Sequence, residues 1–232
     1  MGTTVSGVGV LDKSVAVLDV LENGPASLAA LVAATGLSRA TAHRLAVALE
    51  AHGLVRRDAD GRFALGVRLI ALGQAAARAI PLAEAARPAL EALRKATGES
   101  VQLYVREGSR RVCIASLESP HGLRTIVPLG ASLPLERGSA GRALTLSGRS
   151  PDAGARVSTD ATFRHPWVES VEEREAGVAS VSAPVFGPDG AVVAAVSVSG
   201  PIDRTTRRPG RKYADKVVEA ARRIERAAGY RS

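Results

Sequence analysis

The chain has 232 residues, 46% of them hydrophobic and 23% charged, which allows two compact domains with buried cores. A single cysteine, Cys113, excludes an internal disulfide, and no apolar run is long enough to span a bilayer. Met1 is not followed by the basic, apolar and cleavable segments of a secretory signal. We therefore expect a cytoplasmic protein that does not associate with membranes.

The formal net charge of +8 is unevenly distributed along the chain. Residues 1–66 carry six basic and six acidic side chains, whereas residues 200–232 carry ten basic and four acidic ones. Net charge is therefore no argument for nucleic-acid binding by the first segment. The placement of individual basic residues has to decide that question.

Three helices are predicted at the start of the chain. Apolar residues recur at helical spacing over Val10–Leu21, and Ser27 is a good cap for a second helix over Leu28–Thr35. Gly36 then supplies a tight turn, and Ser38 caps a third helix that contains no proline. This pattern predicts a helix-turn-helix on a three-helix core.

The third helix has an apolar face and a polar, basic face. Its apolar positions at helical spacing are Ala42, Leu45, Ala46 and Leu49. The polar side chains toward its N-terminal end are Ser38, Arg39, Thr41, His43 and Arg44. In a helix-turn-helix protein this part of the helix meets base edges in the major groove, where arginine binds guanine through two hydrogen bonds. An ordinary helical pair with a solvated face is the alternative.

A predicted hairpin after the third helix favours a DNA-binding helix-turn-helix over an ordinary helical pair. Two short runs within Leu54–Leu65 flank a strong turn signal centred on Asp60. Arg56, Arg57 and Arg62 lie on or beside this wing, where arginine reaches phosphates or the minor groove. Helix, turn, helix and wing together favour binding of double-stranded DNA by a first domain, residues 1–66.

A helix rich in glycine and alanine follows over residues 66–79 and is apolar on a broad face. We interpret residues 67–80 as a linker helix that pairs with its copy in a second subunit. The reason is that operators read by such proteins are usually two-fold symmetric. Packing within its own chain is the alternative.

Residues 81–232 combine helices and strands, which predicts an α+β domain with an antiparallel sheet. A helix over Pro81–Thr97, kinked or interrupted near Pro88, precedes a hairpin over residues 100–117. Leu123–Val127 is a further candidate strand.

Three more elements are expected toward the C-terminus. They are a short helix over residues 138–146, a hairpin of strands over residues 178–186 and 191–199, and a long basic helix over residues 206–229. The polar stretch 148–168 gives no clear pattern.

Serines within the two valine-rich strands mark a candidate ligand site. Period-two geometry places each pair on one face of its strand. The pairs are Ser180 with Ser182 and Ser197 with Ser199. If both faces point inward, the hydroxyls line a small polar pocket, with an anion site where the helix at Ser139 begins. The alternative is that they face solvent on the outer side of a one-sided sheet.

The rival functional class is an enzyme acting on a small carboxylate. The histidines, at positions 43, 52, 121 and 165, share no metal-ligand spacing, and Cys113 has no evident base nearby. No nucleophile elbow or phosphate loop occurs, and Gly7-Val-Gly9 lacks the rest of a dinucleotide motif. We therefore expect no catalytic residue, no metal ligand and no cofactor.

Taken together, these elements resemble the IclR family of bacterial transcription regulators. The segments that carry the resemblance are Leu37–Leu45, Leu133–Leu144, Gly177–Val185 and Val193–Ile202. Over residues 7–13 and 177–201 the chain is similar to the actinobacterial NdgR-type subgroup, whose members govern genes of amino-acid metabolism.

The resemblance implies a GAF-like effector domain, a homodimer or tetramer on a palindromic operator, and a pocket for an amino acid or small carboxylate. It leaves open whether the regulator represses or activates. It places pocket residues at Ser139, Ala140, Ser180, Ser197 and Ser199.

Two departures from the family pattern bear on the ligand. An acidic residue used by some members falls near Ser170, where this chain has no carboxylate, so Glu172 or Glu173 is the candidate replacement. Glu136 and Arg137 stand where many members have histidine and a small residue.

Overall fold

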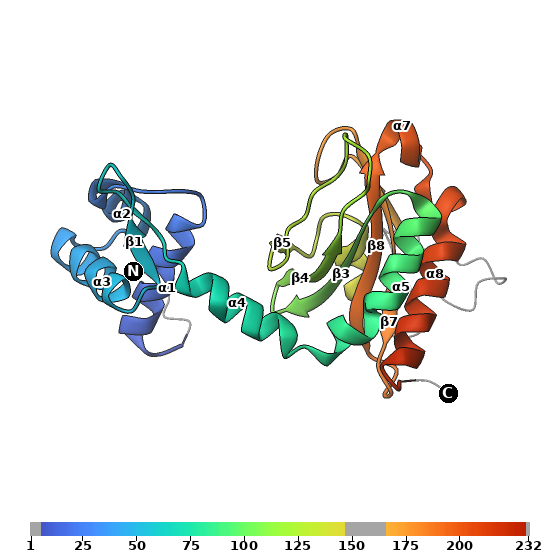
Figure 1. Cartoon of the computed structure of the whole chain (residues 1–232), viewed down its shortest axis with the longest axis horizontal. Helices are drawn as coiled ribbons and strands as arrows, with labels where there is room; N and C mark the ends of the chain where they lie inside the picture. The colour runs from blue at the N-terminus through green and yellow to red at the C-terminus, as the bar shows by residue number, and fades with distance from the viewer. Residues whose placement is uncertain (1–5, 147–165, 231–232) are drawn as a thin grey trace. The chain divides into compact units, whose positions relative to one another are not determined.

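The computed structural model describes residues 6–146 and 166–230, without the side chains of residues 77 and 78. The chain divides into two compact units, one ending at Ala76 and the other beginning at Ala77 (Figure 1). Each unit has its own hydrophobic core.

The first unit is a three-helix core with a two-stranded antiparallel wing. Its elements are α1 (Gly9–Leu21), α2 (Leu28–Thr35), α3 (Arg39–Ala51), β1 (Val55–Arg57) and β2 (Phe63–Leu65), followed along the chain by α4 (Arg68–Arg78). Ala26 and Phe63 exchange two backbone hydrogen bonds of 2.8 and 2.9 Å, which fix the wing to the loop before α2. The predicted winged helix-turn-helix is confirmed.

Local sequence signals explain where α2 and α3 begin. The Ser27 hydroxyl accepts a hydrogen bond from the Ala30 amide, and the Ser38 hydroxyl accepts one from the Thr41 amide, each at 3.2 Å. Between the helices Gly36 has a φ of 67°, a left-handed conformation that costs glycine little because it has no Cβ. The sharp turn between the two helices therefore depends on this glycine.

The second unit is built on an antiparallel sheet with helices on both faces. Its described elements are α5 (Pro81–Thr97), β3 (Ser100–Glu107), β4 (Arg110–Leu117), β5 (Ser132–Pro134), α6 (Ser139–Leu144), β6 (Val168–Val171), β7 (Val178–Phe186), β8 (Val192–Pro201), α7 (Ile202–Thr205) and α8 (Pro209–Ala227). Among the described residues the strand order is β5-β4-β3-β8-β7-β6. Helices α5 and α8 lie side by side against one face (Figure 1), and α6 packs on β7 and β8 from the other.

Alternation along the strands gives this sheet an apolar face and a polar face. Val101, Val181 and Val198 belong to the core beneath α5 and α8. Directly opposed residues share a face, and the register pairs one serine from each of four neighbouring strands. This row is Ser100, Ser199, Ser180 and Ser170, and the adjacent row contains Gln102, Ser197 and Ser182. These seven residues form what we call the serine face.

One predicted strand is wrong. Leu123–Val127 is a loop, and the edge of the sheet is instead β5, which pairs with β4. The Ser100 hydroxyl donates a hydrogen bond to the Thr125 carbonyl at 2.7 Å, so a side chain rather than a strand partner holds this loop. Leu123 and Ile126 are 70% and 55% exposed, whereas Val127, at the end of the segment, is 3% exposed and packs in the core with Ala140 and Leu144 of α6.

Helix boundaries in this unit also differ from the prediction. The last long helix begins at Pro209, because Thr206 has a φ of 69°, which separates it from the short α7. Helix α5 continues through Pro88 without interruption. Pro88 is exposed, so the carbonyl that loses its donor lies on the solvent side of the helix.

Strand β6 begins at Val168, the last residue of the stretch without a clear pattern. Residues 148–165 of that stretch, which include His165, lie outside the described residues. Within the described ranges, no helix has both the length and the apolar character needed to cross a membrane.

Candidate functional site

Helix α3 presents the side chains that were predicted to contact DNA. Arg39, His43 and Arg44 are exposed, whereas Ala42, Ala46 and Leu49 are buried and Leu45 is half-buried. Thr41 is also half-buried, and its hydroxyl lies 2.9 Å from the Ser38 hydroxyl. The two arginines and the histidine are therefore accessible, and Ser38 is exposed too, although its hydroxyl accepts from the Thr41 amide.

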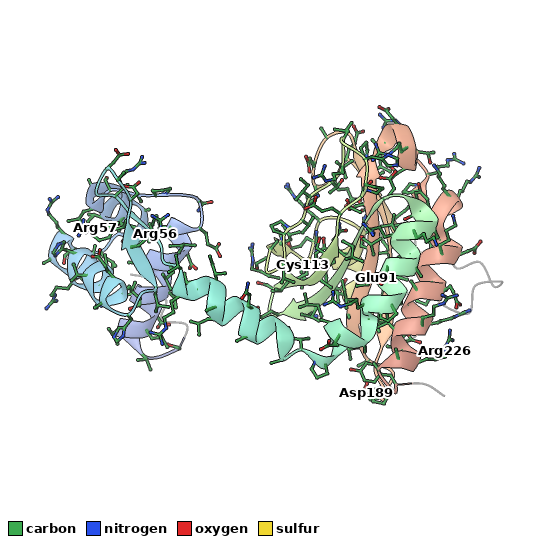
Figure 2. The ribbon with its side chains drawn as sticks, in the orientation of Figure 1. Arg56, Arg57, Glu91, Cys113, Asp189 and Arg226 are labelled. Carbon is green, nitrogen blue, oxygen red and sulfur yellow. The ribbon has the colours of Figure 1, made fainter. Side chains whose placement is uncertain are left out.

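The three wing arginines differ in what holds them. The Arg57 guanidinium lies 4.2 Å from the centroid of the Phe63 ring and donates to the Gly61 carbonyl at 3.0 Å. Arg62 forms ion pairs with two carboxylates of the wing turn, at 2.8 and 3.0 Å. Arg56 is exposed (Figure 2) and forms no ion pair with any residue that the structure describes. Among the described residues, Arg56 therefore lacks the contacts that hold Arg57 and Arg62.

Serine hydroxyls form a hydrogen-bonded chain beneath α6. The Ser139 hydroxyl lies 2.8 Å from that of Ser180 and 2.7 Å from that of Ser182. Ser182 in turn donates to Ser197 at 2.9 Å. Ser199 instead donates to the Gln102 side-chain carbonyl at 3.0 Å. The helix covers this face, so the serines do not form a solvent-facing outer surface.

A cavity of about 30 Å³ lies against the serine face. Its walls include all five residues predicted for the pocket: Ser139, Ala140, Ser180, Ser197 and Ser199. They also include Glu173, Arg174 and Glu175 from the loop between β6 and β7. The cavity has room for roughly one or two water molecules, so a metabolite would require neighbouring side chains to move.

Two cavity residues, Gln102 and Arg111, were not predicted. Gln102 is 1% exposed, and its Nε2 group has no hydrogen-bond partner among the described residues. Arg111 is 3% exposed and donates from Nη1 to the carbonyls of Pro134 and Arg137, whereas its Nε has no partner there. Its guanidinium carbon lies 5.4 Å from the centroid of the Tyr104 ring. Each residue therefore has an unused buried donor.

The candidate replacement carboxylates lie in different places. Glu172 accepts hydrogen bonds from the Gly177 amide at 3.2 Å and from Arg207 at 2.9 Å, which lower its pKa, and it does not line the cavity. Glu173 does line it, but its Oε2 accepts from the Gly138 amide at 3.1 Å and its Oε1 accepts from Arg142. The predicted anion site at the start of α6 thus adjoins a carboxylate of the chain itself.

Two features of the described residues bear on an enzymatic role: the grouping of possible metal ligands and the state of the Cys113 thiol. No group of three or more His, Cys, Asp or Glu side chains in those ranges is arranged to hold a metal ion. Cys113 is buried on β4 (Figure 2), and burial raises the pKa of its thiol to about 12. The thiol is therefore protonated at neutral pH and is a poor nucleophile.

Comparison with known proteins identifies both units. Residues 10–59 match the IclR helix-turn-helix domain, and residues 74–154 and 158–226 match the C-terminal domain of the bacterial transcriptional regulator IclR. The HTH-type transcriptional regulator KipR of Bacillus subtilis (strain 168) is 28% identical over 240 residues, which cover 94% of this chain and 96% of KipR.

Solved structures agree with this identification. The IclR protein of Thermotoga maritima is 26% identical, with a TM-score of 0.66 over 96% of this chain and 99% of that one. An IclR homolog from Microbacterium hydrocarbonoxydans, complexed with 4-hydroxybenzoate, has the same fold at 21% identity, with a TM-score of 0.73 over 96% of this chain and 100% of that one. The chain therefore belongs to the IclR family of DNA-binding transcriptional regulators.

Proposed function

We propose that this regulator binds a palindromic operator as a homodimer and responds to a small carboxylate or amino acid held against the serine face. In this proposal residues 1–66 bind DNA, residues 67–80 link the domains, and residues 81–232 bind the effector. The observation that carries the effector assignment is the buried hydroxyl chain beside a cavity with unused donors. The 4-hydroxybenzoate complex of the homolog supports a carboxylate.

The DNA-binding surface has two roles in this proposal. The exposed side chains of α3, above all Arg39 and Arg44, read base edges, with Ser38, Thr41 and His43 beside them. Arg56, Arg57 and Arg62 contact phosphates or the minor groove, which positions the domain without reading sequence.

Fluorescence anisotropy with a duplex from the chain's own promoter tests these roles. Replacing Arg44 by alanine is expected to cost about 1–3 kcal/mol on the specific site, because a base contact is lost. Arg56→Ala is expected to weaken all sequences similarly and to reduce the salt dependence. Arg211→Ala, on the exposed side of α8, is the control. Unchanged promoter binding by the Arg39→Ala and Arg44→Ala double variant would refute the assignment.

Helix α4 is the proposed dimer contact. Val67, just before this helix, is 72% exposed, and Ile70 within it is 63% exposed, an unusual exposure for large apolar side chains. In a dimer this contact sets the spacing of the two α3 helices. An effector that binds one spacing better than the other then shifts the operator affinity.

The finer physiological assignment is regulation of amino-acid metabolism genes, as in the NdgR-type subgroup. The apolar part of the cavity wall consists of Tyr104, Ala140 and Val178, because valines such as Val181 and Val198 face the core beneath α5 and α8. The proposed ligand for this wall is a branched-chain amino acid or its precursor. A thermal-shift screen of amino acids and central metabolites tests this, because a ligand specific for the folded state adds about 2.7 kcal/mol at a concentration of 100 Kd.

Two further experiments test where the effector binds and whether the protein is a binding protein or an enzyme. Loss of the thermal shift in a Ser197→Val and Ser199→Val double variant would support the cavity, whereas a shift that survives both changes would place the site elsewhere. The alternative function, an enzyme acting on the same carboxylate, predicts turnover. Mass spectrometry of the ligand after a day of incubation distinguishes catalysis from binding.

A further inference from the structure

We infer that the loop between β6 and β7, residues 172–177, is a lid over the cavity and that Glu173 latches this lid closed. The lid controls entry to the proposed effector site, so its role in regulation rests on the proposed function. Three features of the second unit support the lid: the size of the cavity, the contacts that hold the loop, and the backbone conformation at the two ends of the loop.

The cavity in its closed form is too small to admit a metabolite. Its volume is about 30 Å³, which is room for about one or two water molecules. Three consecutive loop residues, Glu173, Arg174 and Glu175, form part of its wall, and strands of the sheet and the start of α6 form the rest of the described wall. The sheet and α6 pack in hydrophobic cores, so their displacement would break apolar contacts. The loop is the described wall that can move without this cost.

The loop has no apolar anchor of its own. Five of its six residues are exposed, and Arg174 is half-buried. None of the six belongs to the hydrophobic clusters of the described residues. Segments with few buried apolar contacts open at a lower free energy than the core does. We therefore expect the loop to open while the sheet beneath it stays folded.

Glu173 joins the loop to the segment that begins α6. Its Oε2 accepts a hydrogen bond from the Gly138 amide at 3.1 Å, and its Oε1 accepts one from the Arg142 guanidinium. Arg142 is fixed in turn by a hydrogen bond of 3.0 Å to the Glu169 carbonyl. Gly138 is buried and the Arg142 side chain is 25% exposed, so these charge-assisted bonds are partly shielded from water. A single carboxylate thus binds two donors that do not belong to the loop.

The ends of the loop have the conformation and the contacts of a hinge. Glu172 has a φ of 56° and Gly177 a φ of 76°, in the left-handed region that side-chain residues rarely adopt. The Glu172 carboxylate accepts from the Gly177 amide at 3.2 Å and from Arg207 at 2.9 Å, so it ties the two ends of the loop together. Residues 173–176 can therefore swing outward while the ends stay in place. Hinges consist of a few such residues at the ends of a moving segment.

Thiol labelling inside the cavity of the full chain measures how often the lid opens. Cys113→Ala removes the native thiol, and Ser197→Cys places a thiol on the cavity wall at a position that is 3% exposed. Methyl methanethiosulfonate reacts with this thiol when the cavity is open. We expect Glu173→Ala in this background to raise the labelling rate at least roughly tenfold, because the closed form loses the latch.

Two further variants separate the latch from a general effect of loop substitutions. Glu175→Gln is the matched control, because Glu175 lines the same cavity but its described ion pair is with the adjacent Arg174, and it should leave the labelling rate unchanged. Arg142→Met breaks the latch from the side of α6 and should raise the rate as Glu173→Ala does. The two changes together should raise it by less than the product of their separate effects, because both remove the same contact.

Hydrogen exchange measured by mass spectrometry distinguishes a lid from a loop that only supports the fold. In the Glu173→Ala variant we expect faster exchange in residues 172–177 and at Gly138, and unchanged exchange in β3, which lies within the sheet. An equal acceleration in β3 would show that Glu173 stabilises the whole unit, and it would overturn the inference.

The outcomes also separate the lid from the proposed function. A labelling rate that Glu173→Ala leaves unchanged would overturn the lid and leave the effector assignment intact, because that assignment depends on the thermal-shift screen. If the labelling rate rises as expected but no compound of the screen binds, the effector part of the proposed function fails while the lid is supported.

Discussion

Gly66 lies directly after the wing, against the backbone of Gly53 and Leu54. A Cβ at this position would lie 2.1 Å from the Gly53 carbonyl oxygen and 2.8 Å from the Leu54 carbonyl carbon, and backbone atoms cannot move aside cheaply. We expect Gly66→Ala to reduce the free energy of unfolding of the first unit by about 1–3 kcal/mol, measured by urea unfolding.

Gly73, within α4, is the matched control for this substitution. A Cβ there meets no atom within 4 Å, so Gly73→Ala is expected to stabilise the helix by about 0.5–1 kcal/mol through propensity alone. Equal effects of the two substitutions would show that the close backbone approach at Gly66 is unimportant.

Cys113 provides a second prediction for a single residue. Because burial raises its pKa to about 12, the thiolate fraction at pH 8 is very small, and the side chain is 0% exposed. We expect Ellman's reagent to label the folded chain far more slowly than the chain in denaturant. Rapid labelling of the folded chain at pH 8 would contradict the buried position.

Single residues also show where sequence reasoning about the site succeeds and fails. The serines were found because hydroxyls are unusual at alternate positions of valine-rich strands. Gln102 shares this period-two face with Ser100, so the same pattern carried a signal for it. No sequence signal marked Arg111 as a buried residue, because an arginine next to a hairpin turn is usually solvated. Its burial depends on contacts with the carbonyls of Pro134 and Arg137, more than twenty residues away.

At the scale of elements, the wing turn has a pH-dependent support. Asp58 accepts hydrogen bonds from the Asp60 and Arg62 amides at 3.0 and 2.9 Å. Burial raises its pKa, but the hydrogen bonds from Arg62 outweigh that effect, so the pKa lies below its ordinary value of 3.8. A carboxylate whose pKa is lower in the folded state stabilises the fold at pH values above its pKa in the unfolded chain. This stabilisation is lost as the pH falls through the pKa of the folded state.

Asp58→Asn is therefore expected to lower the stability of the first unit at pH 7. The difference from the unsubstituted chain should shrink as the pH falls below 3.8, which urea unfolding across pH 3–7 measures. Asp60→Asn is the control, because Asp60 pairs with Arg62 from a side chain that is 72% exposed. A difference that grows on acidification would contradict the role of Asp58.

Elements with a local signal were predicted well, and elements defined by distant partners were not. Ser27 and Ser38 cap their helices through hydrogen bonds to the amide three residues later, so the start of each helix can be predicted from the local sequence. Strand β6 has four residues and exists because it pairs with β7. The three-residue β5 likewise depends on β4, whereas the more apolar segment Leu123–Val127 has no strand partner among the described residues.

For the whole molecule, the proposed dimer gives a direct prediction. Ile70→Asp places a charge on the exposed apolar side of α4 and is expected to reduce the dimer fraction at micromolar concentration in sedimentation experiments. Affinity for a palindromic site should fall more than affinity for a half-site. Gln74→Asp, at another exposed position of α4, is the control. An unsubstituted chain that is monomeric and still binds the palindrome tightly would refute the dimer.

In the sheet of the second unit, the residues that stabilise the core and the residues that line the cavity lie on opposite faces. The same strands carry Val181 and Val198 toward the core and Ser180 and Ser199 toward the cavity. Because neighbouring residues point to opposite faces, substitutions at alternate positions change one surface and leave the other in place. A mutant library restricted to the serine face would thus explore new effectors while preserving the valine core, so the fold is well suited to conversion into sensors for chosen small molecules.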